Sequence, residues 1–182
     1  MLKLLVCVYL NNWCLTDVLV LVDVGRCLPI TKRCFLFSVP SSLKVNSKKV
    51  CFGTRGNSYG SFTMPYNGKI SAFKLVHLRG SVSCRAVDNR FSYWGCDVGE
   101  FLNTFLSNST NAVVFPQISG INSYTLPGIW SNSTEPSFKS LTVPLSVSKG
   151  QEFRVWYGED LKDESETDNG GRTCMDIYAL YV

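Results

Sequence analysis

The C-terminal segment, residues 151–182, constrains the fold of this chain more than any other part. It begins with an alternating run, residues 153–157 (FRVWY), and ends with a second apolar run, residues 175–182. Alternation among β-branched and aromatic residues predicts half-buried strands. The connecting sequence is acidic and ends in Asp-Asn-Gly-Gly, which is typical of a turn. We therefore expect a long hairpin with an acidic tip.

Short apolar runs separated by turn residues continue through the chain back to about residue 50. They are residues 59–64, 69–78, 81–87, 111–115 and 141–148. Asn67-Gly68 favours a tight hairpin between the first two. No sustained helical period appears after residue 50, although residues 100–106 have room for one or two helical turns. The pattern predicts an all-β fold, an antiparallel, jelly-roll-like β-sandwich of about seven or eight short strands.

The N-terminal residues differ from this pattern, and we place the domain at residues 46–182. Residues 1–45 are expected to be poorly structured or removable. Lys3 precedes a short apolar run as in a signal peptide, but no small-residue cleavage site follows, so a mis-assigned start is an equal interpretation. The apolar run at residues 15–24 is too short to span a bilayer, and no transmembrane span is predicted.

Cysteine usage and sequons favour a secreted, extracellular protein. The domain contains Cys51, Cys84, Cys96 and Cys174, widely spaced and without the pairs that bind zinc. We interpret them as two disulfides, which implies an oxidising compartment. A disulfide between Cys84 and Cys96 would close a short ring and stabilise the folded state by roughly 3 kcal/mol. Cys51 and Cys174 would then form the other pair. This pairing is preferred, and all three connectivities stay open. Asn108 and Asn132 begin Asn-x-Ser/Thr acceptors, which predict glycosylation.

Charge is distributed unevenly along the chain. Residues 1–150 hold fifteen basic and six acidic side chains, whereas residues 151–182 hold three basic and eight acidic ones. No Lys/Arg run exceeds two residues. The sequence therefore lacks the basic patch of a nucleic-acid binder, and no nucleic-acid partner is expected.

The acidic segment is a candidate calcium site, because carboxylates and turn carbonyls are the oxygen ligands that calcium prefers. The candidate ligands are Glu159, Asp160, Asp163, Glu164, Glu166 and Asp168. The spacing does not match an EF-hand, since position six of that frame is Asn169 and position twelve is Met175. A solvated loop kept open by charge repulsion is the alternative interpretation. Ca²⁺ is the one cofactor that the sequence suggests.

No catalytic set is apparent, and we predict that the protein is not an enzyme. Residues 56–60 match G-x-S-x-G, but the sequence that follows cannot form the helix that a nucleophile elbow requires. His77 is the single histidine and lies among apolar neighbours with no local carboxylate to orient it. Residues 56–60 are therefore predicted to be a turn. Tyr93, Trp94 and Trp130 are the aromatic candidates for ligand contact, with Tyr93 and Trp94 expected to be exposed in the loop before Cys96.

Several motifs resemble an uncharacterised extracellular module of predicted secreted and surface proteins from corals and sea anemones. They are Cys51-Phe52-Gly53, KISAFKLVH, Ser92-Tyr93-Trp94-Gly95-Cys96 and GQEFRVWYGEDL…DNGGRTCMDIYALY. The resemblance covers roughly residues 50–182. It implies secretion and a β-rich module, and it assigns no catalytic or binding residues.

Together these features predict a secreted, disulfide-stabilised recognition or adhesion module. Its loops would bind an extracellular glycan or a protein surface, with or without calcium. The alternative is a structural protein of the extracellular matrix or of mineral, without a small-molecule ligand. A calcium-induced rise in melting temperature and a glycan-array signal would favour the first interpretation.

Overall fold

The computed structural model describes residues 5–6, 35–36 and 41–182, apart from residues 118, 119, 121 and 140–142. The chain divides into two units, Met1–Pro40 and Ser41–Val182. In the first unit, β1 (Leu5–Val6) pairs antiparallel with β2 (Phe35–Leu36). The signal-like run otherwise lies outside the described residues, so both interpretations of the N-terminus stay predictions.

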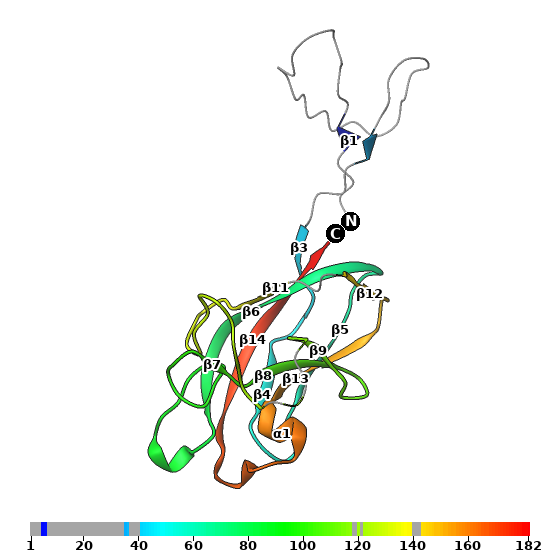
Figure 1. The fold of residues 1–182 in the computed structure, drawn as a ribbon. Helices are drawn as coiled ribbons and strands as arrows, with labels where there is room; N and C mark the ends of the chain where they lie inside the picture. Colours follow the sequence, from blue (N-terminus) through cyan, green and yellow to red (C-terminus); the bar gives the residue numbers. More distant parts are fainter. Residues whose placement is uncertain (1–4, 7–34, 37–40, 118–119, 121, 140–142) are drawn as a thin grey trace, which may run out of the picture. The chain divides into compact units, whose positions relative to one another are not determined.

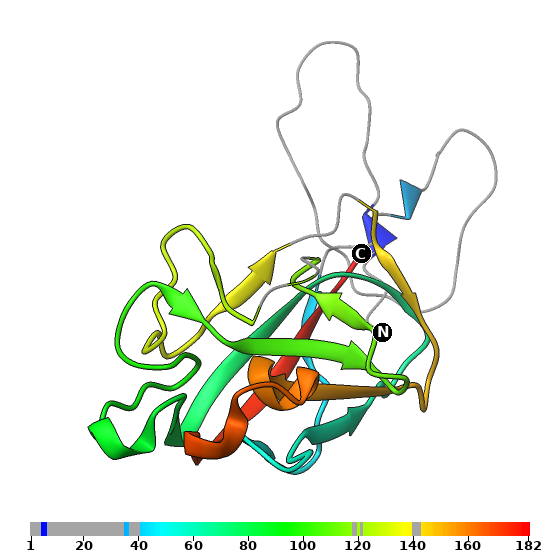
Figure 2. The ribbon, with the colours of Figure 1, turned by 60° about the horizontal axis from the view of Figure 1, so that its bottom comes forward.

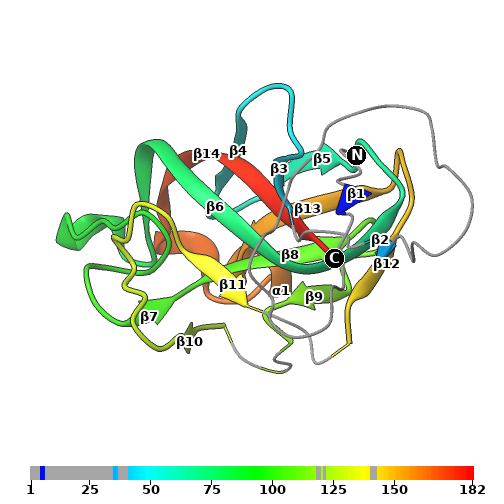
Figure 3. The same cartoon turned by 90° about the horizontal axis from the view of Figure 1, so that it is seen from above.

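The second unit is all-β, and its strands form two main antiparallel sheets (Figure 3), which confirms the predicted fold class. The first sheet has the order β11-β6-β14-β3, with β12 also paired to β6 and β4 to β14, and the second has the order β5-β13-β8-β9. The strands of the first are β3 (Ser41–Lys44), β4 (Val50–Gly53), β6 (Gly68–Ser83), β11 (Ser137–Lys139), β12 (Leu145–Val147) and β14 (Gly170–Tyr181). Those of the second are β5 (Gly60–Thr63), β8 (Thr104–Asn108), β9 (Val113–Phe115) and β13 (Glu152–Tyr157), and β7 (Phe101–Leu102) pairs separately with β10 (Tyr124–Thr125).

The long strands β6 and β14 form the centre of the first sheet and run side by side (Figure 1). Along β14 the burial alternates, with Met175, Ile177 and Ala179 buried and Asp176 and Tyr178 partly exposed. This two-residue period turns one face of the sheet to the core and the other outward.

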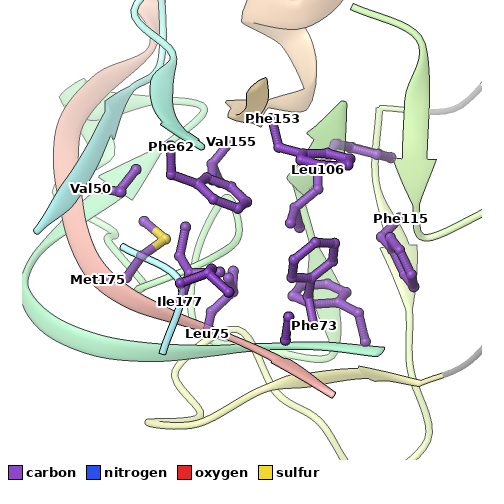
Figure 4. Close-up of a cluster of buried hydrophobic side chains, with 14 of the residues drawn as sticks. Val50, Phe62, Phe73, Leu75, Leu106, Phe115, Phe153, Val155, Met175 and Ile177 are labelled. Atoms are coloured by element: carbon purple, nitrogen blue, oxygen red, sulfur yellow. The ribbon is translucent and has the colours of Figure 1, made fainter. Parts of the chain in front are cut away.

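The core lies between the two sheets and is rich in phenylalanine (Figure 4). Phe153 of β13 stacks on Phe62 of β5 at 5.8 Å between ring centroids. Across the sandwich, the Phe153 ring lies 5.7 Å from Phe73 of β6, which also meets Phe115 edge-on at 5.2 Å. Such offset and edge-to-face pairs add to the free energy gained by burying the rings.

The predicted hairpin over residues 151–182 is wrong. β13 belongs to the four-stranded sheet and β14 to the six-stranded one, so the segment between them crosses from one sheet to the other. That segment contains α1 (Gly158–Lys162) and the 3-10 turn η2 (Glu166–Asp168). Alternation identifies both strands, but it carries no information about the sheet that each strand joins.

Two further local predictions also differ from the structure. Asn67-Gly68 does not close a hairpin, because β5 and β6 belong to different sheets. Residues 100–106 form β7 and β8 instead of a helical turn. In both cases tertiary pairing overrides a local preference. The only other helical segment among the described residues is the 3-10 turn η1 (Ala86–Asp88).

Both preferred disulfides are present in the structure. Cys51 of β4 lies directly opposite Cys174 of β14 and is bonded to it. Cys84 and Cys96 close the short loop that contains η1. The first of these bonds joins residues 123 positions apart, and a link over so long a loop removes much entropy from the unfolded chain.

The compact unit begins at Ser41 and not at residue 46 as expected. β3 pairs with the end of β14, with Ser41 opposite Tyr181 and Lys44 opposite Tyr178. Lys44 also forms an ion pair with Asp176 at 2.7 Å. The polar sequence around β3 resembles a linker, but backbone pairing does not require apolar side chains.

We predict that Phe153→Ala lowers the free energy of unfolding by about 3–5 kcal/mol, because it leaves a cavity between the two sheets. Urea unfolding followed by tryptophan fluorescence measures the change. Phe101→Ala is the matched control, since the Phe101 side chain is 63% exposed. It should change stability by about 0.5 kcal/mol or less. Equal losses in the two variants would contradict the assignment of the core.

Candidate functional site

A cleft of about 190 Å³ opens on the loops beside the β7/β10 pair. It is lined by Glu100, Thr125, Leu126, Pro127, Gly128, Ile129 and Trp130. Residues 126–129 form a tight turn, in which Ile129 N donates to Leu126 O at 3.0 Å and Gly128 has φ of +73°. Glycine adopts this left-handed conformation without the steric cost of a Cβ atom. The turn brings Trp130 to the cleft that Glu100 also lines.

The backbone on both sides of Trp130 is fixed by serine hydrogen bonds. Trp130 N donates to Ser133 Oγ at 2.8 Å. Ser131 is buried, donates its N–H to Gly99 O at 2.8 Å and its hydroxyl to Asp97 O at 2.6 Å, and accepts from Gly99 N at 2.9 Å. These bonds attach the Trp130 segment to the loop before β7, so an exposed aromatic side chain stands on a rigid support.

The cleft combines an apolar ring with polar side chains. Trp130 is 50% exposed, and Glu100 and Thr125 are exposed beside it. A flat aromatic surface next to a few hydrogen-bonding groups is the usual composition of a small-ligand site. An aromatic ring can pack on the C–H face of a sugar while a carboxylate and a hydroxyl bind its hydroxyl groups.

The other two aromatic candidates do not join this cleft. The expectation that Trp94 is exposed is wrong: the side chain is fully buried and its Nε1 donates to Ser133 O at 2.7 Å. Tyr93 is half-buried and stacks on His77 at 3.7 Å. His77 is a packed residue, whose Nε2 lies 2.8 Å from Gly80 O. The short loop closed by Cys96 does not force its aromatic residues outward.

α1 is the short helix between β13 and β14 (Figure 2), and a second polar region surrounds it. There Asp160 accepts hydrogen bonds from Asn57 N at 2.7 Å and Ser58 N at 2.8 Å, and Glu166 Oε2 accepts one from Gly56 N at 3.1 Å. Gly56 and Asn57 both have positive φ, which these residue types tolerate. The G-x-S-x-G sequence is therefore a turn held by two carboxylates, as its context predicted.

The carboxylates predicted as calcium ligands have separate surroundings, apart from Asp160 and Glu166, which hold one loop. Asp168 lies 4.0 Å from Arg85, and Glu164 accepts a 3.4 Å bond from Asn122, while Asp163 is exposed. Among the described residues, no three His, Cys, Asp or Glu side chains form a group that could hold a metal ion. The six-carboxylate calcium site stays a prediction.

Several buried oxygen atoms near α1 have no hydrogen-bond partner among the described residues. Three of them are Asn103 Oδ1, Asn122 Oδ1 and Glu159 Oε2. Their segments are adjacent, because Gly158 N donates to Asn103 O at 2.7 Å and Asn103 Nδ2 donates to Asn122 O at 3.1 Å. Burial raises the pKa of Glu159, a hydrogen bond from the Asn169 side chain lowers it, and the charge of Asp168 raises it further. A buried acceptor without a donor indicates an additional partner such as water or a cation.

The two sequons differ in their surroundings, and glycosylation stays a prediction for both. Asn132 is exposed in the turn that follows Trp130. Asn108 ends β8, and its Oδ1 accepts hydrogen bonds from Thr110 N at 3.0 Å and Ala112 N at 2.9 Å. The Asn108 side chain therefore already supports its turn.

The fold and the site define a disulfide-linked antiparallel β-sandwich with an aromatic cleft on its loops. No protein-family model and no curated protein matches this chain. A solved structure does: AJLec from the sea anemone Anthopleura japonica, a lectin, has a TM-score of 0.71 and 33% sequence identity, over 78% of this chain and 98% of AJLec. The chain belongs to the same family as AJLec. The sea anemone source of AJLec agrees with the resemblance to cnidarian modules.

Within the described residues, no helix is long and apolar enough to cross a membrane. Disulfides of this kind are typical of proteins from oxidising compartments. The disulfides agree with an extracellular protein.

The ionisation of Asp160 should make stability depend on pH. The pKa of Asp160 is raised to about 6, because burial and the neighbouring Glu166 outweigh the hydrogen bonds from Asn57 N and Ser58 N, which lower it. The folded state binds the proton of the Asp160 carboxyl more tightly than the unfolded chain does. The contribution of this group to the free energy of unfolding is therefore fully present below about pH 4 and is lost as the pH rises through about 6. Asp160→Asn should reduce that decline, and the part that remains comes from Glu159, whose pKa burial also raises.

Urea midpoints from pH 4 to pH 7 test this prediction. Asp163→Asn is the matched control, because Asp163 is exposed and asparagine tolerates its left-handed conformation. It should keep the pH profile of the unmodified protein. An unchanged profile in Asp160→Asn would exclude Asp160 as the titrating group.

Proposed function

We propose that the protein is a secreted, non-enzymatic carbohydrate-recognition module that binds a glycan in the Trp130 cleft. The observation that carries the proposal is the half-exposed Trp130 ring, held beside Glu100 and Thr125 on a rigid support. Membership of the AJLec family supports the class of ligand. Loops on a rigid β-sandwich are also where recognition proteins usually place their contacts.

The proposed orientation follows from the lining of the cleft. The C–H face of a pyranose packs on the indole of Trp130, and its hydroxyl groups bind the Glu100 carboxylate and the Thr125 hydroxyl. The cleft holds about 190 Å³, which suits one terminal sugar better than an extended chain. Ser131 acts indirectly, since it fixes the backbone of its neighbour Trp130.

We predict that Trp130→Ala weakens binding of a neutral glycan by roughly tenfold or more, as expected when an aromatic anchor is truncated. A glycan array first selects the best neutral saccharide, and titration calorimetry then measures its Kd for the full chain and the variant.

Tyr66→Ala is the control for that experiment. Tyr66 is another aromatic residue with 50% exposure and does not line the cleft. The Kd of Tyr66→Ala should stay within about twofold of the Kd of the unmodified protein. Such a change in binding free energy is well under the 1.4 kcal/mol that corresponds to tenfold. Equal weakening in both variants would reject the cleft as the site, while saturable binding that neither variant changes would place it elsewhere.

Calcium is proposed as an accessory ligand at the α1 end, in a narrower form than the sequence suggested. Of the six carboxylates, only Glu159 has a buried oxygen without a partner among the described residues. With Asn103 and Asn122 it offers the all-oxygen donor set that calcium prefers. A bound cation would satisfy these acceptors and lower the pKa of Glu159, which burial raises.

We predict that calcium raises the melting temperature of the full chain, because a ligand at one hundred times its Kd stabilises the folded state by about 2.7 kcal/mol. Glu159→Gln should abolish the rise, and the exposed Asp163→Asn should keep it. Differential scanning calorimetry with calcium or EDTA measures the shift. A rise that survives in Glu159→Gln would place the ion elsewhere, and no rise at all would remove calcium from the proposal.

The alternative function is a structural role in extracellular matrix or mineral. It predicts adsorption to calcium carbonate or collagen-like surfaces that Trp130→Ala leaves unchanged, and no saturable binding of any small saccharide. The glycan array therefore separates the two functions.

A further inference from the structure

A separate cleft of about 390 Å³ lies where β4 and β14 continue into their neighbouring loops. It is lined by Gly53, Thr54, Arg55, Ser58, Tyr59, Gly170, Gly171 and Arg172. Gly53 stands opposite Arg172 in the β4/β14 register, so the arginine faces no side chain on the β4 side, while Ser81 of β6 lies opposite it on the other side. A Cβ atom on Gly53 would come within 2.9 Å of Ser58 Cβ. Glycines thus keep the space beside Arg172 open.

The charged residues that line this cleft are all basic. Arg55 and Arg172 are exposed there, and none of the lining residues is acidic. The ion pairs of the described residues include neither arginine. Arg55 Nη1 donates to Thr167 O at 3.2 Å, which orients its guanidinium and leaves the other N–H groups free to bind a ligand.

Two hydroxyl groups add neutral donors to the cleft. Ser58 is exposed in the loop before β5. Tyr59 is held with its ring centroid 4.6 Å from that of Trp156 and 4.5 Å from Arg154 Cζ. Arg154 therefore places a third positive charge near the cleft, although it also pairs with Glu152 at 2.6 Å.

The nearest carboxylates already bind the loop that carries Arg55. Asp160 accepts from Asn57 N and Ser58 N, and Glu166 accepts from Gly56 N. They hold the loop in place and do not line the cleft. The arginines and hydroxyls therefore face a volume that offers hydrogen-bond donors and is lined by no competing carboxylate.

We propose that this cleft binds a tetrahedral oxyanion, the sulfate ester of an acidic glycan. Guanidinium groups bind such anions through paired N–H donors, and these charge-assisted bonds are the strong ones. The site goes beyond the Trp130 cleft and does not depend on it, since the two clefts share no lining residue. A free sulfate or phosphate ion has the same chemistry, and the experiment distinguishes the two sources.

The test measures binding of a heparin-derived tetrasaccharide, its desulfated counterpart and sodium sulfate to the full chain. The variant is Arg55→Gln with Arg172→Gln. Losing two charge-assisted contacts should raise the Kd for the sulfated tetrasaccharide at least tenfold. The desulfated sugar should not bind this cleft. If sodium sulfate alone binds as tightly and with the same arginine dependence, the site stands and its ligand is the free ion.

The matched control is Arg79→Gln with Arg90→Gln, which removes the same two charges from exposed positions outside the cleft. It should change the Kd less than twofold. An equal loss in both double variants would mean diffuse attraction to net charge and would overturn the proposal, as would tetrasaccharide binding that neither variant weakens. Trp130→Ala should leave sulfate-dependent binding unchanged, so the two proposals fail independently.

Discussion

The pairing of β14 with β6 is the interaction on which the rest of the structure depends. Twelve register pairs join the two strands, and the other edge of β14 pairs with β4 and β3. The buried face of these strands, with Phe73 of β6 and Ile177 of β14, forms one side of the core. Because Cys174 bonds to Cys51 within this sheet, covalent and hydrogen-bonded links converge on one strand. The loops that form both clefts are positioned by this central pair and by the sheet that packs on it.

Alternation and turn residues were sufficient to predict the class of fold, because each strand has one buried face whatever its partners are. They could not predict which strands pair. Residues 153–157 and 175–182 are both correctly strands, yet they belong to different sheets. The disulfides were predictable since cysteine pairing has few alternatives, and the first and last strands of a sandwich often lie together. The polar strand at residues 41–44 was missed, because its pairing is made by the backbone.

The candidate sites were only partly visible in the sequence. Trp130 was singled out from its residue type alone, but its partner Glu100 lies thirty positions away in the chain, and the β7/β10 pairing and the Ser131–Gly99 hydrogen bonds bring the two together. Trp94 looked equally suitable and is buried, since the segment after Trp130 covers it. The orphaned oxygens of Asn103 and Asn122 carried no sequence signal, because an isolated asparagine is common in loops. Likewise, Arg55 and Arg172 meet only in the folded chain.

The ends of the compact unit lie next to each other, since Ser41 of β3 stands opposite Tyr181 of β14. The loops around α1 are at the other end of β14, which at about 3.3 Å per residue is roughly 36 Å away over its twelve residues. Tension applied to the two ends would therefore act on one antiparallel pair at a single point. β3 would separate from β14 one residue pair at a time until the load reaches the Cys51–Cys174 disulfide, which still holds β4 to β14. The unit can thus lengthen under load without losing the loops that carry its clefts.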